Sequence, residues 1–550
     1  MSVDPRRIAP VAVAGVLAFV YVVVSPPSLD LATHLLRAKL FTVQGFGIWN
    51  NWWYGGHHTP SYSVLFPPAA AALTPQLAAA IAATATAALF APLAHDRFGP
   101  DSWLGATWFG AATATNLFTG RLAFAFGLLP AVAAMLALER RRPVPACGLA
   151  ALSALCSPVA ALFAAIGGAA YAIGAWMGAR QDREDQHPPA PTPADPPVHP
   201  PAAARARAQP PNPLAGIALA AAALIPVAAL AIAFPEGGTE PFTFATLWPI
   251  PVVGVAALLA LPRDAWTLRA GVALYVAGCL VAFAIATPVG SNVARLGALV
   301  AGPLAALLWW RRRPALLLAV AVPLIYLQWQ APVRDVRTAT GDPSASAAYY
   351  QPLLDFLGRQ SGPPFRVEIP FTQFHWEAYV VAPRFPIARG WERQLDIQDN
   401  HLFYGGALNP QTYHAWLRSL AVRFVAVPDA RLDYSAHRET RLIDRGLPYL
   451  RLARRMRHWA VYEVIDATPI VQGAATLRSI GSDALTISVL RPGTALVHVR
   501  FTPYWKLGDG FGCVMPAGDF THLTLRHAGV TRLAAAFSLG RVGARSPRCS

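Results

Sequence analysis

The chain has 550 residues, of which 55% are hydrophobic and only 13% are charged. This composition argues against an ordinary soluble protein and is typical of a polytopic membrane protein with soluble parts attached. The formal net charge of +16 would also suit a nucleic-acid-binding protein. Many of the basic residues, however, lie in short loops between apolar runs, as the positive-inside rule requires, so we expect no nucleic-acid partner.

The first apolar run, about residues 8–24, follows Arg6 and Arg7 and could pass for a secretory signal. No small-x-small cleavage site follows it, so we expect an uncleaved first span. The next stretch, residues 25–68, contains an acid, three histidines, five aromatic residues between positions 46 and 54, and five prolines. A segment that only connected two spans would not need this chemistry.

A helix is predicted near the start of this stretch. Pro26 and Pro27 stop the first span, and Ser28 is placed to cap a helix with Asp30 in its first turn. At about 100° per residue, one narrow face holds Asp30, His34, Arg37 and Phe41, and the opposite side holds Leu29, Ala32, Leu36 and Leu40. This pattern predicts a helix lying in the membrane interface. In the alternative interpretation, Asp30 is only a first-turn dipole acid and the other polar side chains face water.

Ten further apolar runs follow, so the sequence predicts about eleven transmembrane helices, several of them short against the ~20 residues of a straight crossing. They lie at about residues 67–94, 103–118, 121–138, 144–157, 158–178, 213–234, 243–261, 267–286, 296–310 and 314–329. A segment rich in proline, alanine and charge, residues 181–212, is predicted to be a disordered cytoplasmic linker. It separates a first membrane block, residues 1–180, from a second, residues 213–332.

The distribution of basic loops predicts a cytoplasmic N-terminus. The loops around residues 95–97, 139–142, 263–264 and 310–313 then lie inside, together with the linker. The opening stretch and residues 119–121, 234–241, 287–295 and everything after about 330 lie outside. We therefore expect the catalytic or binding chemistry of residues 25–66 on the same external face as the C-terminal region.

The C-terminal region is predicted to form an external α/β domain, residues 333–466, and an external β-sandwich, residues 467–550. Expected helices lie at 346–359 and 410–420, and expected strands at 365–369, 423–427 and 460–465. Period-two alternation at 484–490, 495–501 and 521–527 suits the sandwich. Cys513 and Cys549 lie there as an even pair and are expected to form a disulfide, whereas Cys147, Cys156 and Cys279 lie in apolar spans as packing residues.

Motifs for soluble nucleotide-dependent or hydrolytic chemistry are missing from the sequence: it has no GxxxxGK[ST], HExxH, paired CxxC or GxSxG, and no GxGxxG between a strand and a helix. Ionisable groups gather instead at the predicted outer ends of spans: Asp30, His34, Arg37, His57, His58, Arg121, Glu236, Glu240 and Arg295. Transporters tend to place such groups near the membrane midplane and to contain repeats. This layout predicts a reaction or binding site at the outer surface.

The pattern Asp30-x3-His34-x2-Arg37, followed by Trp49, Trp52, Gly55-Gly56 and Pro67-Pro68, resembles the first external loop of the GT-C superfamily of membrane glycosyltransferases. Residues 116–121, 290–295 and 504–510 also resemble segments of its little-characterised bacterial members, which end in an external domain. The resemblance implies a GT-C-like fold in the bacterial plasma membrane. It further implies a polyprenyl-phosphate sugar donor and an envelope glycan, lipid or protein as acceptor.

In that superfamily an acid of the first external loop acts at the catalytic centre, and Asp30 is the matching residue. Many members have two adjacent acids there, whereas Leu29 precedes Asp30. A metal-assisted reaction, with a divalent metal as the one cofactor to consider, would therefore need Glu236 or Glu240 as the second carboxylate. His57 and His58 are weak candidates for metal ligands.

The remaining candidate residues have chemical roles in such a transfer. Guanidinium groups bind phosphate oxygens, so Arg37, Arg121 and Arg295 are candidates for the donor phosphate, although each could instead snorkel to lipid headgroups. His34, Glu236 and Glu240 are supporting candidates. Candidates for sugar or acceptor contact are Trp49, Trp52, Trp53, Tyr54, His375, Trp376, Glu377 and Trp391; the first four would equally suit an interfacial aromatic belt, and the last four a buried core.

The sequence thus predicts a polytopic α-helical membrane protein with a C-terminal external α/β plus β-sandwich domain, acting as a glycosyltransferase of the cell envelope. Two other functions stay open. One is a transporter of lipid-linked envelope intermediates, and the other is a non-catalytic assembly protein that holds envelope enzymes through its external domain.

Overall fold

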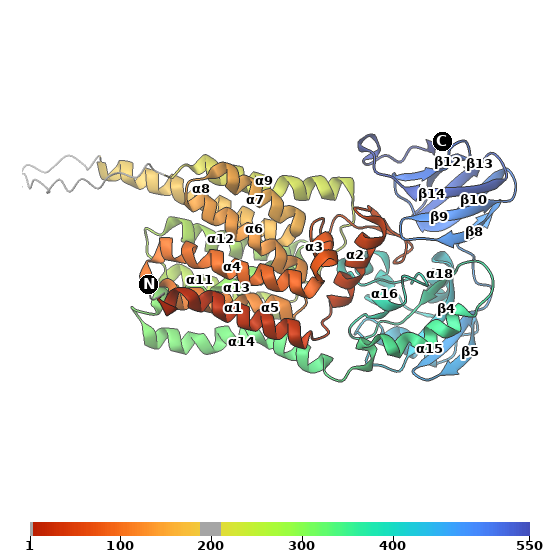
Figure 1. Cartoon of the computed structure of the whole chain (residues 1–550), viewed down its shortest axis with the longest axis horizontal. Coiled ribbons are helices and arrows are strands. Elements are labelled where there is room, and N and C mark those ends of the chain that lie inside the picture. The colour runs from red at the N-terminus through yellow and green to blue at the C-terminus, as the bar shows by residue number, and fades with distance from the viewer. Residues whose placement is uncertain (1–3, 187–210) are drawn as a thin grey trace, which may run out of the picture.

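The computed structural model describes residues 4–186 and 211–550. A helical region is followed by a C-terminal region of β-sheets and short helices, and the N-terminus lies at the end of the helical bundle that points away from the sheets (Figure 1). The longer helices are α1 (Pro5–Val24), α2 (Leu31–Gln44), α3 (Phe66–Leu73), α4 (Pro75–Phe98), α5 (Trp103–Phe118), α6 (Leu122–Glu139), α7 (Pro143–Cys156), α8 (Pro158–Gln186), α9 (Pro213–Ala233), α11 (Pro249–Ala260), α12 (Trp266–Ala284), α13 (Ala294–Trp309) and α14 (Pro314–Ala339), with the short α10 (Phe244–Leu247) before α11.

Among the described residues, eight helices are long and apolar enough to cross a membrane: α1, α4, α6, α8, α9, α12, α13 and α14. Helix α7 and the segment Phe244–Ala260 are apolar but shorter, and α5 has 16 residues. An apolar helix of that length can cross the hydrocarbon core and satisfies its own backbone hydrogen bonds there. The chain is therefore a multi-pass membrane protein with a C-terminal β-sheet domain. The number eleven stays a prediction.

Three predicted segments differ from the structure in their bounds. The run 67–94 is broken at Thr74, which has φ +80° and caps α4 by accepting from the Leu77 N–H, because Pro75 excludes a helical residue before it. Helix α14 continues to Ala339, past both the predicted span end at 329 and the domain start at 333, since the first glycine comes only at Gly341.

The third segment is the linker, whose predicted start is wrong. Residues 181–186, with the sequence QDREDQ, continue α8, because Gln, Arg and Glu are good helix formers and the first proline comes at position 188. The rest of the predicted linker, residues 187–210, lies outside the described residues. Residues 211–212 lead directly into α9, where the Asn212 side chain caps the first turn.

The α/β part of the C-terminal region contains a mixed sheet in the order β3-β4-β6-β5, in which only β3 and β4 are parallel. Its strands are β3 (Arg366–Glu368), β4 (Val422–Pro428), β5 (Leu450–Met456) and β6 (Trp459–Val464), and its helices are α15 (Ala347–Gly358), α16 (Glu377–Val380), α17 (Arg393–Asp399), α18 (Pro410–Ser419) and α19 (His437–Asp444). The predicted helices at 346–359 and 410–420 are confirmed as α15 and α18, and the three predicted strands as β3, β4 and β6.

Two antiparallel sheets follow, in the orders β15-β12-β13-β10-β7 and β11-β14-β9-β8. Their strands are β7 (Val471–Gly473), β8 (Ala475–Ile480), β9 (Ala484–Val489), β10 (Gly493–Arg500), β11 (Trp505–Leu507), β12 (Gly512–Ala517), β13 (Phe520–Leu525), β14 (Gly529–Ala535) and β15 (Arg548–Cys549). Inward-facing side chains such as Ile487, Val497 and Leu523 form one buried cluster. The period-two segments of the sequence are confirmed as β9, β10 and β13.

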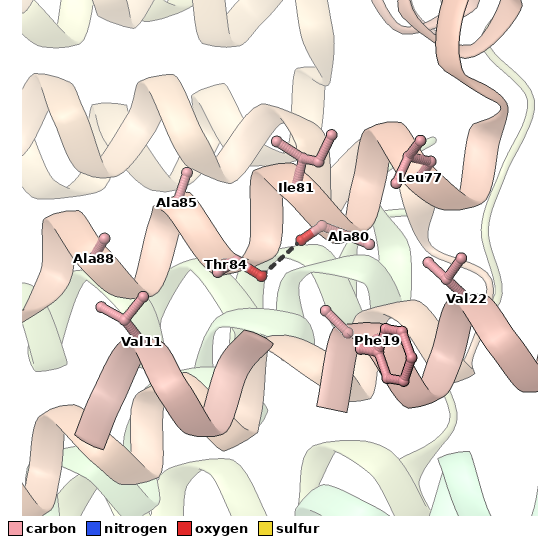
Figure 2. Close-up of a pocket in the computed structure, with 10 residues that line it drawn as sticks. Val11, Phe19, Val22, Leu77, Ala80, Ile81, Thr84, Ala85 and Ala88 are labelled. Carbon is pink, nitrogen blue, oxygen red and sulfur yellow. Dashed lines mark hydrogen bonds between the residues drawn. The ribbon is translucent and has the colours of Figure 1, made fainter. Parts of the chain in front are cut away.

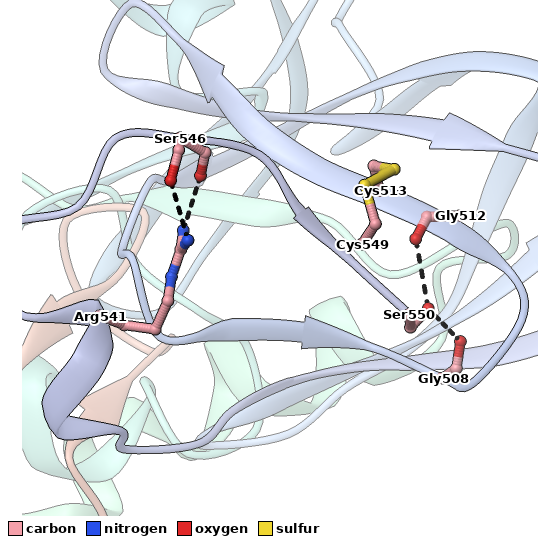
Figure 3. The surroundings of a disulfide bond; sticks show 7 residues. All are labelled: Gly508, Gly512, Cys513, Arg541, Ser546, Cys549 and Ser550. Carbon is pink, nitrogen blue, oxygen red and sulfur yellow. Dashed lines mark hydrogen bonds between the residues drawn. A yellow bond between two sulfur atoms is a disulfide. The ribbon is translucent and has the colours of Figure 1, made fainter.

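A disulfide joins Cys513 of β12 to Cys549 of β15, the pair expected from the sequence, with an S–S distance of 2.01 Å (Figure 3). Next to it, the Ser550 hydroxyl donates to the carbonyl oxygens of Gly508 and Gly512, at 2.9 and 3.2 Å. The bridge and these bonds fasten the end of the chain to the sheet. Cys156 and Cys279 are free and buried in the helical region, and Cys147 is free and half-buried.

One of the loops predicted to share a side with the C-terminal region, residues 234–241, contacts that region, as does the end of α9 before it. The Gly238 N–H donates to Gln398 Oε1 at 2.6 Å, and the Tyr504 hydroxyl donates to the carbonyl oxygen of Ala233 at 2.7 Å. Helix α2 lies between the bundle and the sheets (Figure 1). These contacts place one end of the helical bundle against the C-terminal region; that this side is extracellular stays a prediction.

Candidate functional site

Asp30 lies where the opening stretch meets the C-terminal domain. It occupies the N-cap position of α2, but its carboxylate makes no capping hydrogen bond. Instead, Trp391 Nε1 donates to Asp30 Oδ1 at 3.2 Å, and the Thr33 hydroxyl donates to the Trp391 carbonyl oxygen at 2.7 Å. The carboxylate is therefore held by the C-terminal domain and is not used by its own helix.

The prediction that Ser28 caps this helix is wrong. Helix α2 begins at Leu31, and the Ser28 hydroxyl, fully buried, has no hydrogen-bond partner within the described part of the chain. Ser28 instead packs closely against Gly120, where an added Cβ would lie 2.2 Å from Ser28 Oγ. The turn between α5 and α6 thus packs against the residues just before Asp30.

Two guanidinium groups act on Asp30 through their charges: Arg121, in that turn, and Arg295, at the start of α13. Burial has the largest effect on the Asp30 carboxyl and raises its pKa, while Arg295, Arg121 and the Trp391 hydrogen bond lower it, and the net shift is upward. Burial likewise lowers the pKa of Arg121, to about 10. A carboxylate with a raised pKa is a stronger base than an ordinary aspartate.

Both arginines retain unused donors. The ion pairs that arginines form in residues 4–186 and 211–550 include neither Arg121 nor Arg295. Arg295 donates to Asn292 and lies over the ring of Phe124 at 5.4 Å, but its Nε has no hydrogen-bond partner. Two guanidinium groups without a carboxylate partner are suited to bind an anion.

Glu240 belongs to the same group of charges. Burial raises its pKa, and it is coupled electrostatically to Arg295 and Asp30. It accepts a hydrogen bond from the Ser291 hydroxyl at 3.2 Å. Glu236, by contrast, accepts from the His58 N–H at 2.6 Å and lies 2.9 Å from His58 Nδ1, so it is already engaged. Of the two glutamates, only Glu240 is left to act together with Asp30.

The sequence predicted that Arg37 binds the donor phosphate or snorkels to lipid headgroups. In the structure its guanidinium does neither, because it is bound to other protein groups. Its side chain is only 4% exposed, forms an ion pair with Glu392 and donates to the carbonyl oxygen of Thr59 at 3.0 Å. The guanidinium also lies over the ring of Tyr62 at 4.3 Å. The loop and the C-terminal domain therefore use Arg37 to bind to each other.

Helix α2 is not an interfacial helix with its polar face in water. Leu36 and Leu40 pack into the core of the C-terminal domain, and His34 is fully buried on the bundle side, with its Nε2 3.0 Å from the carbonyl oxygen of Gly120. Burial lowers the pKa of His34 to about 3, so the ring is neutral. His34 thus supports the site by holding the turn that carries Arg121.

The four aromatic residues of the opening stretch that were candidates for sugar contact are buried in protein, so they neither contact a sugar nor form an interfacial belt. Trp49 packs in the sandwich core, and Trp52, Trp53 and Tyr54 pack in the α/β core, each at most 6% exposed. Trp53 Nε1 donates to the carbonyl oxygen of Ala378 at 3.0 Å. These side chains join the opening stretch to the C-terminal domain.

The predicted acceptor contacts of the C-terminal domain are also mostly interior. His375 is fully buried and stacks on Trp391, with ring centroids 3.4 Å apart. Glu377 is buried and accepts from the Thr372 hydroxyl at 2.6 Å, and Trp376 is half-buried against the cores on both sides. Only Trp391 reaches the candidate site, and it reaches it with its N–H group.

The two adjacent histidines do not form a metal site. His57 Nε2 lies 3.0 Å from Asn50 Nδ2, and His58 Nε2 lies 2.9 Å from the Thr502 hydroxyl. In the part of the chain that the structure describes, no group of three or more His, Cys, Asp or Glu side chains could hold a metal ion. The two rings bind protein groups instead.

The contacts that cross from the opening stretch to residues 390–393 were not predicted. The signal for them in the sequence is the run of glycine, tryptophan, glutamate and arginine at those positions, which does not specify their partners. An apolar groove of about 510 Å³ lies elsewhere, between α1 and α4 (Figure 2). Its lining is apolar apart from Thr84, whose hydroxyl donates to Ala80, as expected of a surface that faces lipid. No protein-family model matches the chain, and no curated protein matches it.

Proposed function

We propose that the chain is a GT-C-type membrane glycosyltransferase that moves a sugar from a polyprenyl-phosphate donor to an acceptor of the bacterial cell envelope. The observation that carries the proposal is the Asp30 carboxylate under the influence of two guanidinium groups, Arg121 and Arg295, that have no carboxylate partner in the described chain. The two guanidinium groups suit the phosphate of such a donor, and the apolar helices suit its lipid chain. Asp30 lies beside them as the base.

The chemistry assigns each of these groups a step. Asp30 accepts the proton of an acceptor hydroxyl while that oxygen attacks the anomeric carbon of the donor sugar. The bond between the anomeric carbon and the phosphate oxygen breaks, and the phosphate leaves with the bonding electrons. Arg121 and Arg295 compensate the negative charge that develops on this leaving group. Glu240, or a divalent metal beside it, would assist from the second carboxylate position.

The finer features of the fold belong to the same proposal. Eleven spans, with α5, α7 and α11 added to the eight long helices, would place the N-terminus in the cytoplasm and the C-terminal domain outside. The sugar acceptor would then be an external envelope glycan, lipid or protein. The contacts of the opening stretch with the C-terminal domain support a site that both regions form together.

The test is transfer of a radiolabelled sugar from polyprenyl phosphate by the full chain in lipid nanodiscs. We expect Asp30→Asn to lower the rate by roughly 10²- to 10⁴-fold, the usual contribution of a general base. Asp96→Asn is the control, because that carboxylate pairs with Arg140 in a half-exposed ion pair remote from the site. Full activity of Asp30→Asn would remove the catalytic assignment.

A binding measurement separates this function from its rivals. Arg121→Gln and Arg295→Gln should each weaken binding of polyprenyl phosphate by roughly tenfold or more, the loss expected for a charged hydrogen bond. Arg311→Gln, which removes an exposed pair with Asp101, is the control. Wild-type protein that moves the lipid between leaflets without transferring sugar would be a transporter. A stable partner and glycans unaltered by Asp30→Asn would indicate an assembly protein.

A further inference from the structure

We propose that Trp391 of the C-terminal domain is a positioning residue for Asp30, its indole N–H holding carboxylate oxygen Oδ1 so that Oδ2 points to the reacting hydroxyl. The hydrogen bond measures 3.2 Å, and Oδ2 makes no hydrogen bond within residues 4–186 and 211–550. The use of Oδ2 rests on the proposed function, whereas the control of Asp30 by Trp391 does not. The site is then complete only when the C-terminal domain is docked.

The indole is itself fixed on several sides. The Thr33 hydroxyl donates to the Trp391 carbonyl oxygen at 2.7 Å, which ties the residue to the first turn of α2. The buried ring of His375 stacks on the indole at 3.4 Å and 8°, and the Arg393 guanidinium lies over it at 4.6 Å. Arg393 is anchored in turn by Asp433 at 2.7 Å. A donor held this firmly fixes the direction of the bond that it gives.

Comparison with other buried tryptophans shows what distinguishes Trp391. Trp53 Nε1 donates to the carbonyl oxygen of Ala378, and Trp459 Nε1 donates to that of Tyr349, each at 3.0 Å. Those bonds satisfy a buried N–H with a neutral backbone acceptor, as packing alone requires. Trp391 donates to an ionisable carboxylate from another part of the chain, so its bond changes with the protonation state of Asp30.

Asp30 also interacts electrostatically with charged or titratable groups on the neighbouring elements. These are Tyr62 before α3, Arg121 before α6, Glu240 before α10, Arg295 in α13 and Asp335 in α14. The two arginines favour the ionised carboxylate, and Asp335 disfavours it. A hydrogen bond given to the ionised form also favours it, so loss of the indole N–H should raise the pKa of Asp30.

The experiment compares Trp391→Phe with Trp376→Phe. Phenylalanine keeps an aromatic ring against His375 and removes the N–H, while Trp376 is a matched control because its buried Nε1 has no hydrogen-bond partner in the described chain. Asp30 is half-buried, so part of the residue is still open to a small reagent. Its protonated fraction can therefore be followed in the full chain by hydrophobic carbodiimide labelling across pH, with peptide mass spectrometry as the readout.

We expect Trp391→Phe to shift Asp30 labelling to higher pH, so that at a fixed pH well above the midpoint of the transition the adduct rises roughly fivefold, as for loss of one hydrogen bond. Trp376→Phe should leave the curve unchanged. An unshifted curve in Trp391→Phe, or equal shifts in both variants, would overturn the proposal. Transfer assays on the same proteins should show the acidic limb of the rate profile moving with the labelling curve.

Two further measurements keep the outcome decisive. If Trp391→Phe does not fold, Thr33→Val removes the bond that holds the Trp391 backbone to α2, so the indole N–H is no longer fixed against Asp30, and an unchanged labelling curve in that variant would overturn the proposal. If wild-type protein transfers no sugar but the labelling shift is found, the proposed function fails and the link between Trp391 and Asp30 stands.

Discussion

The guanidinium of Arg37 forms an ion pair with the carboxylate of Glu392, 355 residues further along the chain, and these side chains are only 4% and 12% exposed. Removing one partner of a buried pair leaves the other charge unpaired. We expect Arg37→Met to lower the free energy of unfolding by roughly 3 to 5 kcal/mol. Thermal unfolding in detergent, followed by size-exclusion chromatography, measures the loss.

The double variant Arg37→Met, Glu392→Met is the control for this ion pair. Two apolar side chains of similar length can replace a buried pair at little cost, so the double variant should recover most of the lost stability. A single Arg37→Met protein that is as stable as the wild type, yet binds polyprenyl phosphate at least tenfold more weakly, would return Arg37 to the donor site.

Gly56 occupies a position that has no room for a side chain. Its φ is +112°, and an added Cβ would lie 2.4 Å from the ring of Trp49. We expect Gly56→Ala to lower the free energy of unfolding by roughly 2 kcal/mol or more, through both backbone strain and displacement of a buried ring. Gly45→Ala is the matched control, since Gly45 has φ +62° but open space around it. Equal losses in the two variants would show that the contact with Trp49 contributes nothing.

The disulfide between Cys513 and Cys549 closes a loop with a sequence separation of 36 residues. A loop of that size predicts a loss of about 3 to 4 kcal/mol on removal, because the unfolded chain gains conformational entropy. We expect Cys513→Ser, Cys549→Ser protein to lose protease protection of β15 and to unfold at lower temperature. Cys147→Ser, which removes a free thiol, should behave as wild type; equal protection in the double variant would contradict the prediction.

Glu377 should make the stability of the protein depend on pH. Burial raises the pKa of this carboxyl from 4.5 to about 7. Between pH 4.5 and about pH 7 the Glu377 carboxyl is protonated in the folded state and ionised in the unfolded state. The contribution of Glu377 to stability is therefore greatest at low pH and is lost as pH rises toward 7. The difference is roughly 3 kcal/mol at full effect.

The variant Glu377→Gln tests this pH dependence, because its amide does not titrate. Melting temperatures of the two proteins between pH 5 and pH 8 should diverge, with the wild type losing stability relative to the variant as pH rises. Glu439, which also has a raised pKa of about 7, is present in both proteins and cancels in the difference. Parallel melting curves would show that Glu377 is ionised throughout this range.

Local patterns in the sequence were sufficient for most of the elements. Each predicted apolar run contains a helix, because hydrophobicity and length are properties of the segment itself. The alternation in residues 484–490 likewise predicts β9 without knowledge of its partners. The break at Thr74 could also be anticipated, since Pro75 follows it, but the high alanine content on both sides concealed it.

The candidate site could be predicted only in part. The pattern around Asp30 marked the acid, and the topology brought Arg121 and Arg295 to the same end of the bundle. The partners of Arg37 and Trp53 could not be found, because they lie more than 300 residues away and no local pattern specifies them. The same residue types therefore suggested ligand contacts where the structure has an interface between two parts of one chain.

The long sequence separation within that interface has a consequence for biosynthesis. Trp53 donates to Ala378, 325 residues later. At a synthesis rate of roughly 5 to 20 residues per second, the opening stretch waits about 15 to 65 seconds before its binding surface has been made. During that interval the C-terminal residues that bury Trp49, Trp52, Trp53 and Tyr54 have not been made, so these side chains are exposed in the stretch between α1 and α3. The nascent protein is therefore most exposed to misassembly before its last third is translated, and a chaperone on that face of the membrane would act on this loop.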